Sequence, residues 1–131
     1  RAVVEGLAVR WAAEKITPDE MEKLRDVWEL MEFYTQKKNN RKVLELNKKF
    51  HEILYQASRS RFLVQTLKSY QEYVQQSRKV TVYKEDNLRA ILEEHERILR
   101  AVEARNGSLA EKEILMHLAS SRERFHRAKN Q

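Results

Sequence analysis

Apolar residues recur at helical spacing along almost the whole chain, and very little interrupts them. The 131 residues include only two glycines and one proline, so tight turns and irregular loops must be few. Leu, Glu, Lys, Arg, Gln and Ala, which favour helix, are abundant. A chain of this length can form one domain with a real core but not comfortably two. We therefore predict a single all-α domain over residues 1–131, folded as an antiparallel bundle.

Short polar breaks divide the chain into six expected helices. They cover about residues 2–15, 18–36, 43–57 and 61–83, then a segment from Asp86 or Asn87 to Asn106-Gly107, and a last one from Ser108 onward. Thr17 is the expected N-cap of the second helix, with Glu20 completing a capping box. Gly107 is available for a left-handed C-cap, and Ser108 with Glu111 forms a second capping box.

Charge and cysteine content limit the classes of function open to the chain. Its 26 basic and 20 acidic residues give a net charge of +6, which can attract nucleic acid or anionic ligands. The two signs are interleaved, however, as on the solvated faces of helices, and we prefer that interpretation. The chain has no cysteine, which excludes disulfides and thiolate metal sites. No apolar run approaches the roughly 20 residues that span a bilayer, so we predict a cytoplasmic domain without a membrane segment.

Three of the expected helices each place one histidine on an apolar stripe. His51 follows Asn47 by four residues, so both side chains project from one face of their helix. His95 and His117 occupy the same kind of position in the last two helices. Buried polar side chains without partners cost free energy, so these residues need a reason to be there. Imidazoles commonly bind transition metals, and we predict that His51, His95 and His117, assisted by Asn47, hold one divalent ion.

A second interpretation of the histidines stays open. A single histidine on an apolar stripe is more often a core residue with a satisfied hydrogen bond, and the chain would then be a plain dimerisation bundle whose histidines pair with buried hydroxyls. Recurrence on three helices favours the metal site. His126 is the internal comparison: it follows His117 by nine residues, lies about 180° around the helix and is expected to face solvent.

The expected helix over residues 61–83 has an inward stripe of unusual character. Hydroxyls and aromatic rings are mixed there with aliphatic residues, which is typical of the wall of a polar ligand cavity. The predicted ligand-binding side chains are Tyr70, Tyr73, Ser77 and Arg78. Arg78 is included because a guanidinium matches the geometry of a carboxylate. The alternative places the tyrosines at the edge of the core, with their hydroxyls in water, and Arg78 at the surface.

Several of these segments together resemble a known family. They are Asn47-x3-His51 within NKKFHEIL, His95 within EEHERILRAV, His117 within MHLASSRERF, Arg1-x3-Glu5 with Trp11-Ala12-Ala13-Glu14, and Thr17-Pro18-Asp19-Glu20. In this order and spacing they resemble the effector-binding C-terminal domain of GntR-superfamily transcription regulators of the FadR type, the FCD domain. The resemblance covers essentially the whole chain.

The resemblance implies six or seven helices around a central, metal-dependent pocket for a small organic acid. It also implies a homodimer and a winged-helix DNA-binding domain upstream of Arg1. Because the sequence starts there without a methionine, we expect that domain to be missing from this chain. Metal-binding members usually have an aspartate at the position of Asn47. The expected ion is zinc or nickel. Because the amide of Asn47 is neutral, the bound ion would keep its full positive charge, which should favour an anionic ligand.

We therefore predict a regulatory ligand-binding domain and not an enzyme. A small carboxylate metabolite would complete the metal coordination and change the relative placement of the helices in a dimer. We expect the dimer to use the first helix, with Trp11, and part of the helix over residues 61–83. A metal-dependent hydrolase is the rival prediction, and it needs a general base near the ion. Glu52 and Glu94 each adjoin a predicted ligand in sequence, about 100° off its face, so neither is expected to point inward.

Overall fold

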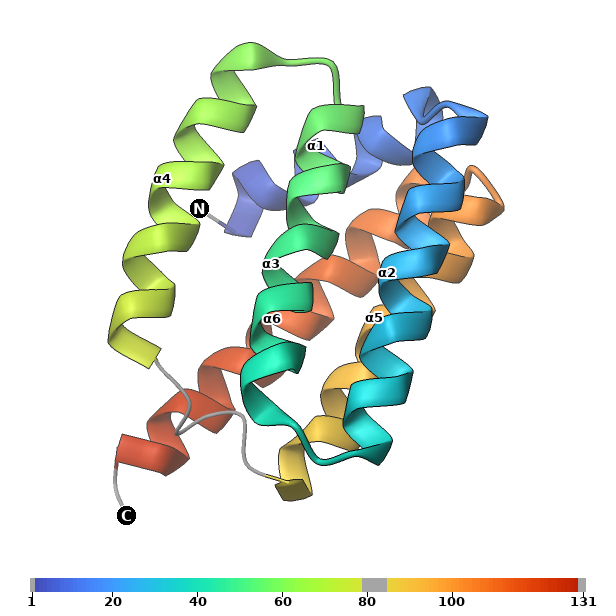
Figure 1. Ribbon diagram of the computed structural model, residues 1–131. Helices are drawn as coiled ribbons and strands as arrows, with labels where there is room; N and C mark the ends of the chain where they lie inside the picture. Colours follow the sequence, from blue (N-terminus) through green and yellow to red (C-terminus); the bar gives the residue numbers. More distant parts are fainter. Residues whose placement is uncertain (1, 79–84, 130–131) are drawn as a thin grey trace.

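The fold is a bundle of α-helices. The computed structural model describes residues 2–78 and 85–129, and the elements in those ranges are all helical. In chain order the helices are α1 (Ala2–Lys15), α2 (Pro18–Gln36), α3 (Asn40–Ala57), α4 (Arg61–Arg78), α5 (Glu85–Glu103) and α6 (Gly107–Lys129). Figure 1 shows α2 beside α3 and α5, with α1 and α6 crossing behind them and α4 at the outer edge. The all-α bundle expected from the sequence is confirmed.

The start of α2 follows the expected capping box. The backbone N–H of Glu20 donates to Oγ1 of Thr17 at 3.2 Å, and the backbone N–H of Thr17 donates to Oε1 of Glu20 at 3.0 Å. The Glu20 carboxylate also pairs with Arg59, which follows α3, with an N–O separation of 2.8 Å. One side chain therefore caps a helix and links it to the turn before α4.

The turn between α5 and α6 differs from the sequence-based expectation. The residue with positive φ is Arg105, at 53°, and the predicted left-handed cap at Gly107 is wrong. Helix α6 already begins at Gly107, and Oδ1 of Asn106 accepts from the backbone N–H of Leu109 at 3.0 Å, so the second capping box at Ser108 is also wrong.

Close packing of α6 on α1 explains why a glycine occupies this position. A Cβ atom on Gly107 would lie 3.1 Å from Cγ and 3.3 Å from the carbonyl oxygen of Arg10. Glu111, the other half of the supposed capping box, instead accepts from Nε of Arg10 at 2.7 Å. Tertiary contact, and not local turn geometry, determines this junction.

Two further helix ends shift slightly from their expected positions. Helix α5 begins at Glu85, so Asp86 and Asn87 lie within its first turn and not before its start. Helix α3 begins at Asn40, capped by Oδ1 of Asn39. The expected end of the fourth helix, over residues 79–83, lies outside the described residues.

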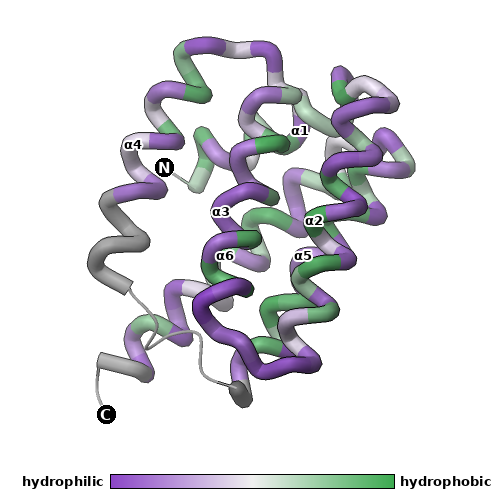
Figure 2. Tube along the Cα trace, in the orientation of Figure 1, coloured by the Kyte–Doolittle hydropathy of each residue, from purple (hydrophilic) through white to green (hydrophobic). Residues whose placement is uncertain are grey.

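The core consists of one large and one small cluster of apolar side chains. The large cluster joins α1, α2, α3, α5 and α6, and the small one joins α1, α3 and α4. Figure 2 shows hydrophilic and hydrophobic residues alternating along α2, α3 and α5, as amphipathic helices require. Among the described residues, no helix is both long and apolar enough to cross a membrane. Several polar side chains, including Asn47, His51, His95 and His117, are buried within this largely apolar core.

Candidate metal centre

Three buried histidines meet in the core, one each from α3, α5 and α6. The side chains of His51, His95 and His117 are 4%, 0% and 6% exposed. Their ring centroids are separated by 4.6 to 5.7 Å, and one nitrogen of each ring lies within 4.8 Å of the others. Two ligands at about 2.0–2.2 Å from a tetrahedral zinc ion lie about 3.3–3.6 Å apart, so the three rings would have to move closer together to bind one ion.

Each of the three histidines has an oxygen acceptor near its Nδ1 atom. Nδ1 of His95 donates to the carbonyl oxygen of Ile91 at 2.7 Å, and Nδ1 of His117 donates to Oε1 of Glu94 at 2.6 Å. Nδ1 of His51 lies 3.3 Å from Oε1 of Glu5. Since these partners are acceptors, Nδ1 carries the proton in each neutral ring, and Nε2 is left with a lone pair for an ion. Outer acceptors that orient ligating imidazoles in this way are typical of metal sites.

Asn47 joins the histidines as expected from its spacing. It is buried one turn before His51, and its Oδ1 atom lies 2.7 Å from Nε2 of His95. Because Nδ1 of His95 donates to a carbonyl, Nε2 of His95 and Oδ1 of Asn47 face each other with a lone pair each. A cation bound to both atoms would remove this repulsion. Turning the amide so that its NH2 group donates would also satisfy the contact. Three imidazole nitrogens and an amide oxygen suit a borderline divalent ion such as zinc or nickel.

Burial keeps the imidazoles in the form that binds metal. Burial lowers the pKa of His95 well below its usual range, and the neighbouring charges of His117 and His51 lower it further. The pKa of His117 is also lowered, chiefly by burial, although the hydrogen bond to Glu94 acts in the opposite direction. Both rings are therefore neutral at physiological pH, as ligands must be.

Glu94 is buried beside the histidines, and the expectation that it does not point inward is wrong. It is 8% exposed, and besides His117 it accepts from both terminal nitrogens of Arg124 at 2.8 Å. Burial alone would raise its pKa, but the hydrogen bonds from Arg124 and His117 bring that pKa down to about 2. The expectation considered only the face of α5 that carries His95; α6 packs along the flank of α5 and brings His117 to Glu94.

Glu5 forms a second outer contact that sequence reasoning missed. It comes from α1, is 5% exposed, and accepts a hydrogen bond from the Tyr55 hydroxyl on α3. Burial raises its pKa, but the interactions with His51 and Tyr55 outweigh that effect, so the pKa of Glu5 is lowered overall. The sequence carried only a weak signal: Glu5 shares helical spacing with Val9 and Ala12, but the buried residues of α1 do not lie on one face.

The remaining predicted residues are only partly placed. Tyr70 is half-buried on α4, whereas the side chains of Tyr73, Ser77 and Arg78 lie outside the described part of the chain. His126 is exposed on α6, as expected. Glu52 is half-buried and does not join the histidines.

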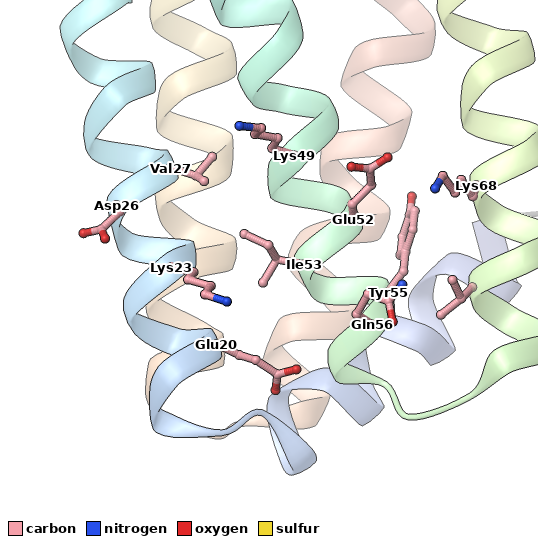
Figure 3. Close-up of a pocket in the computed structure, with 11 residues that line it drawn as sticks. Glu20, Lys23, Asp26, Val27, Lys49, Glu52, Ile53, Tyr55, Gln56 and Lys68 are labelled. Atoms are coloured by element: carbon pink, nitrogen blue, oxygen red, sulfur yellow. The ribbon is translucent and has the colours of Figure 1, made fainter.

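A separate pocket of about 550 Å³ opens between α2, α3 and α4. Figure 3 shows lysine and acidic side chains around it, with Ile53 and Val27 among them. Tyr55 also lines this pocket, and its hydroxyl donates to Glu5. None of the three clustered histidines lines it.

Comparisons with known proteins agree with this architecture. The family model of the FCD domain matches residues 1–120. Among solved structures, E. coli McbR/YncC is similar, with a TM-score of 0.86 and 19% identity over 97% of this chain and 61% of that one. This chain thus spans less than two thirds of that protein, and at this identity the likeness concerns the fold alone. A comparison with curated proteins found no match. The family match confirms the resemblance found in the sequence.

Proposed function

Because this chain belongs to the FCD domain family, we propose that it is the ligand-sensing domain of a transcription regulator. In this proposal His51, His95 and His117, with Asn47, hold a divalent transition metal, zinc or nickel. A small carboxylate metabolite completes its coordination. The observation that supports the proposal most strongly is the orientation of the three buried imidazoles, whose Nδ1 atoms are held by outer acceptors.

The charges of the buried groups favour an anionic effector. Glu5 and Glu94 are two buried carboxylates next to the histidines, and the guanidinium of Arg124 offsets one of them. A divalent cation among neutral imidazoles would therefore leave the centre with a net positive charge. A carboxylate bound at an open coordination position would neutralise it.

The effector-binding wall and the assembly remain part of the proposal. Tyr70, Tyr73, Ser77 and Arg78 on α4 are the proposed hydrogen-bonding partners of the effector. We propose a cytoplasmic homodimer that uses α1 and part of α4, and an upstream winged-helix domain that contacts DNA. Effector binding would shift the relative placement of the helices in the dimer and hence of the DNA-binding domains.

A hydrolase built on the same histidines is less well supported by the charges around the metal centre. Glu94 is the acidic side chain that reaches His117, but both of its oxygens accept from Arg124 and its pKa is about 2. A carboxylate held in this way is a poor general base, because bases work best with a pKa near the operating pH. We therefore propose a sensing role and no catalysis.

Metal and ligand titrations test the proposal. The chelator-stripped domain is titrated with zinc and nickel by calorimetry, and the loaded domain is then titrated with a small dicarboxylate. We expect one ion per chain, a large loss of affinity for His95→Ala, and wild-type affinity for the exposed His126→Ala variant. Dicarboxylate binding that is unchanged in the stripped protein would contradict the metal-dependent pocket. Failure of the folded wild-type domain to bind either metal would overturn the metal site.

A further inference from the structure

We propose that Glu5 is a positioning residue that couples occupancy of the metal centre to helix α1. The inference rests on the proposed function, because it assumes that the histidines bind a cation. It concerns a residue outside the predicted ligand set and a helix that contributes none of those ligands.

The contacts of Glu5 connect α1 directly to α3. Its carboxylate accepts from the Tyr55 hydroxyl and lies 3.3 Å from Nδ1 of His51, and these two partners are one turn apart on α3. All three side chains are buried, with exposed fractions of 5%, 3% and 4% for Glu5, Tyr55 and His51. A change in the strength of the contact between His51 and Glu5 therefore acts directly on α1, because no solvent lies between the two buried side chains.

Cation binding at Nε2 of His51 would strengthen this contact. A bound cation withdraws electron density from the imidazole, so its Nδ1–H group becomes a better donor and the carboxylate a better partner. The separation of 3.3 Å is long for such a bond and leaves room for it to shorten. The effect is reciprocal: if metal tightens the Glu5 contact, the Glu5 charge must tighten metal binding by the same factor.

The charge of Glu5 also replaces one that the ligand set lacks. Asn47 is neutral, so no carboxylate is among the proposed ligands. Glu94 is already compensated by Arg124, with two contacts of 2.8 Å, whereas Glu5 interacts with the neutral hydroxyl of Tyr55 and with His51. Among the described residues, Glu5 is thus the buried carboxylate beside the histidines that pairs with no Lys or Arg side chain, and it belongs to α1.

Helix α1 is well placed to pass the effect on. It packs along α6 and also contacts α3, α4 and α5. Next to Glu5, Gly6 packs so closely on α6 that a Cβ atom would lie 3.2 Å from Cγ of Glu111 and 3.3 Å from Cδ2 of Leu115. A shift of α1 toward the metal centre must therefore change its packing on α6.

Hydrogen exchange with and without zinc tests the coupling. Amide exchange of α1 peptides is measured by mass spectrometry for the wild type, Glu5→Gln and Glu14→Gln, each stripped and at saturating zinc. Glu14 is an exposed residue on α1 and provides the matched control. We expect zinc to slow α1 exchange in the wild type and in Glu14→Gln. Glu5→Gln should bind zinc about tenfold more weakly and show no zinc-dependent protection of α1 at saturation.

The outcomes separate this inference from the proposed function. If the folded wild type binds no zinc, both fail together. If it binds zinc but α1 exchange is unchanged, or Glu5→Gln keeps the protection, only the coupling fails. Tyr55→Phe supplies a second variant that retains the Glu5 charge but removes its hydrogen bond; should Glu5→Gln not fold, full zinc-dependent protection in Tyr55→Phe would overturn the coupling and reduced protection would support it.

Discussion

Both terminal nitrogens of Arg124 donate to the two carboxylate oxygens of Glu94, each at 2.8 Å. The pair links α6 to α5 deep in the bundle, with both side chains under 10% exposed. One oxygen of Glu94 also accepts from Nδ1 of His117. The ion pair therefore fixes the orientation of a proposed metal ligand while keeping a buried charge compensated.

Removing one partner of this pair should be costly for stability. Arg124→Met keeps the apolar stem but leaves Glu94 buried without its cation, and we expect a loss of about 2–4 kcal/mol in the free energy of unfolding. Adding Glu94→Gln to that variant should recover part of the loss, because the uncompensated charge is gone. Urea denaturation of the two single variants and the double variant gives the coupling energy. Additive losses would show that the two residues do not stabilise one another.

The stripped domain should lose stability as the pH falls below about 6.5. His95 and His117 have lowered pKa values, mainly because they are buried, so they stay neutral in the folded state while the unfolded chain takes up protons. The unfolded state then binds more protons, and stability decreases by up to about 1.4 kcal/mol per pH unit for each such histidine. Below the ordinary carboxyl pKa of 4.5, Glu94, with a pKa of about 2, adds a second loss.

Urea denaturation at several pH values checks this expectation. His126→Ala should show the same decline as the wild type, since that side chain is exposed. A free energy of unfolding that stays constant from about pH 7.5 to pH 5 would contradict neutral buried imidazoles.

Helical periodicity was sufficient to predict the bundle and the shared inward phase of the three histidines. His51 and His95 lie on strongly amphipathic helices, and His117 lies on the less amphipathic α6. In each case apolar neighbours at i±3 and i±4 identify the buried face without knowledge of the partner helices. The exposed position of His126 followed from the same argument.

The outer contacts could not be predicted in this way, because they depend on how neighbouring helices pack. Glu94 lies off the main face of α5, and only the approach of α6, with His117 and Arg124, buries it. Helix α1 is surrounded by other helices and is buried on several sides, so no single stripe marks Glu5 as inward. Gly107 was misread for the same reason: its role is contact with α1 and not turn geometry.

Zinc should stabilise the domain by simple mass action. A ligand that binds only the folded state adds about 2.7 kcal/mol at a free concentration of 100 times its dissociation constant. We therefore expect added zinc to raise the melting temperature of the stripped wild type and excess chelator to reverse the change. His126→Ala should respond like the wild type and His117→Ala should not respond. An equal response of His117→Ala would mean that zinc binds elsewhere.

Asn47→Asp should tighten metal binding and alter the preference for the effector. Oδ1 of Asn47 lies 2.7 Å from Nε2 of His95, so a carboxylate at this position is already within reach of the proposed ion. Its negative charge should strengthen binding of a divalent cation by at least about tenfold, or about 1.4 kcal/mol. A less positive centre should in turn hold a small dicarboxylate more weakly, so the gain shrinks when the effector is present. Calorimetric zinc titrations of both proteins, with and without the dicarboxylate, measure the two effects together. If Asn47→Asp binds zinc no better than the wild type, the amide has turned its NH2 group toward His95 and is not a ligand.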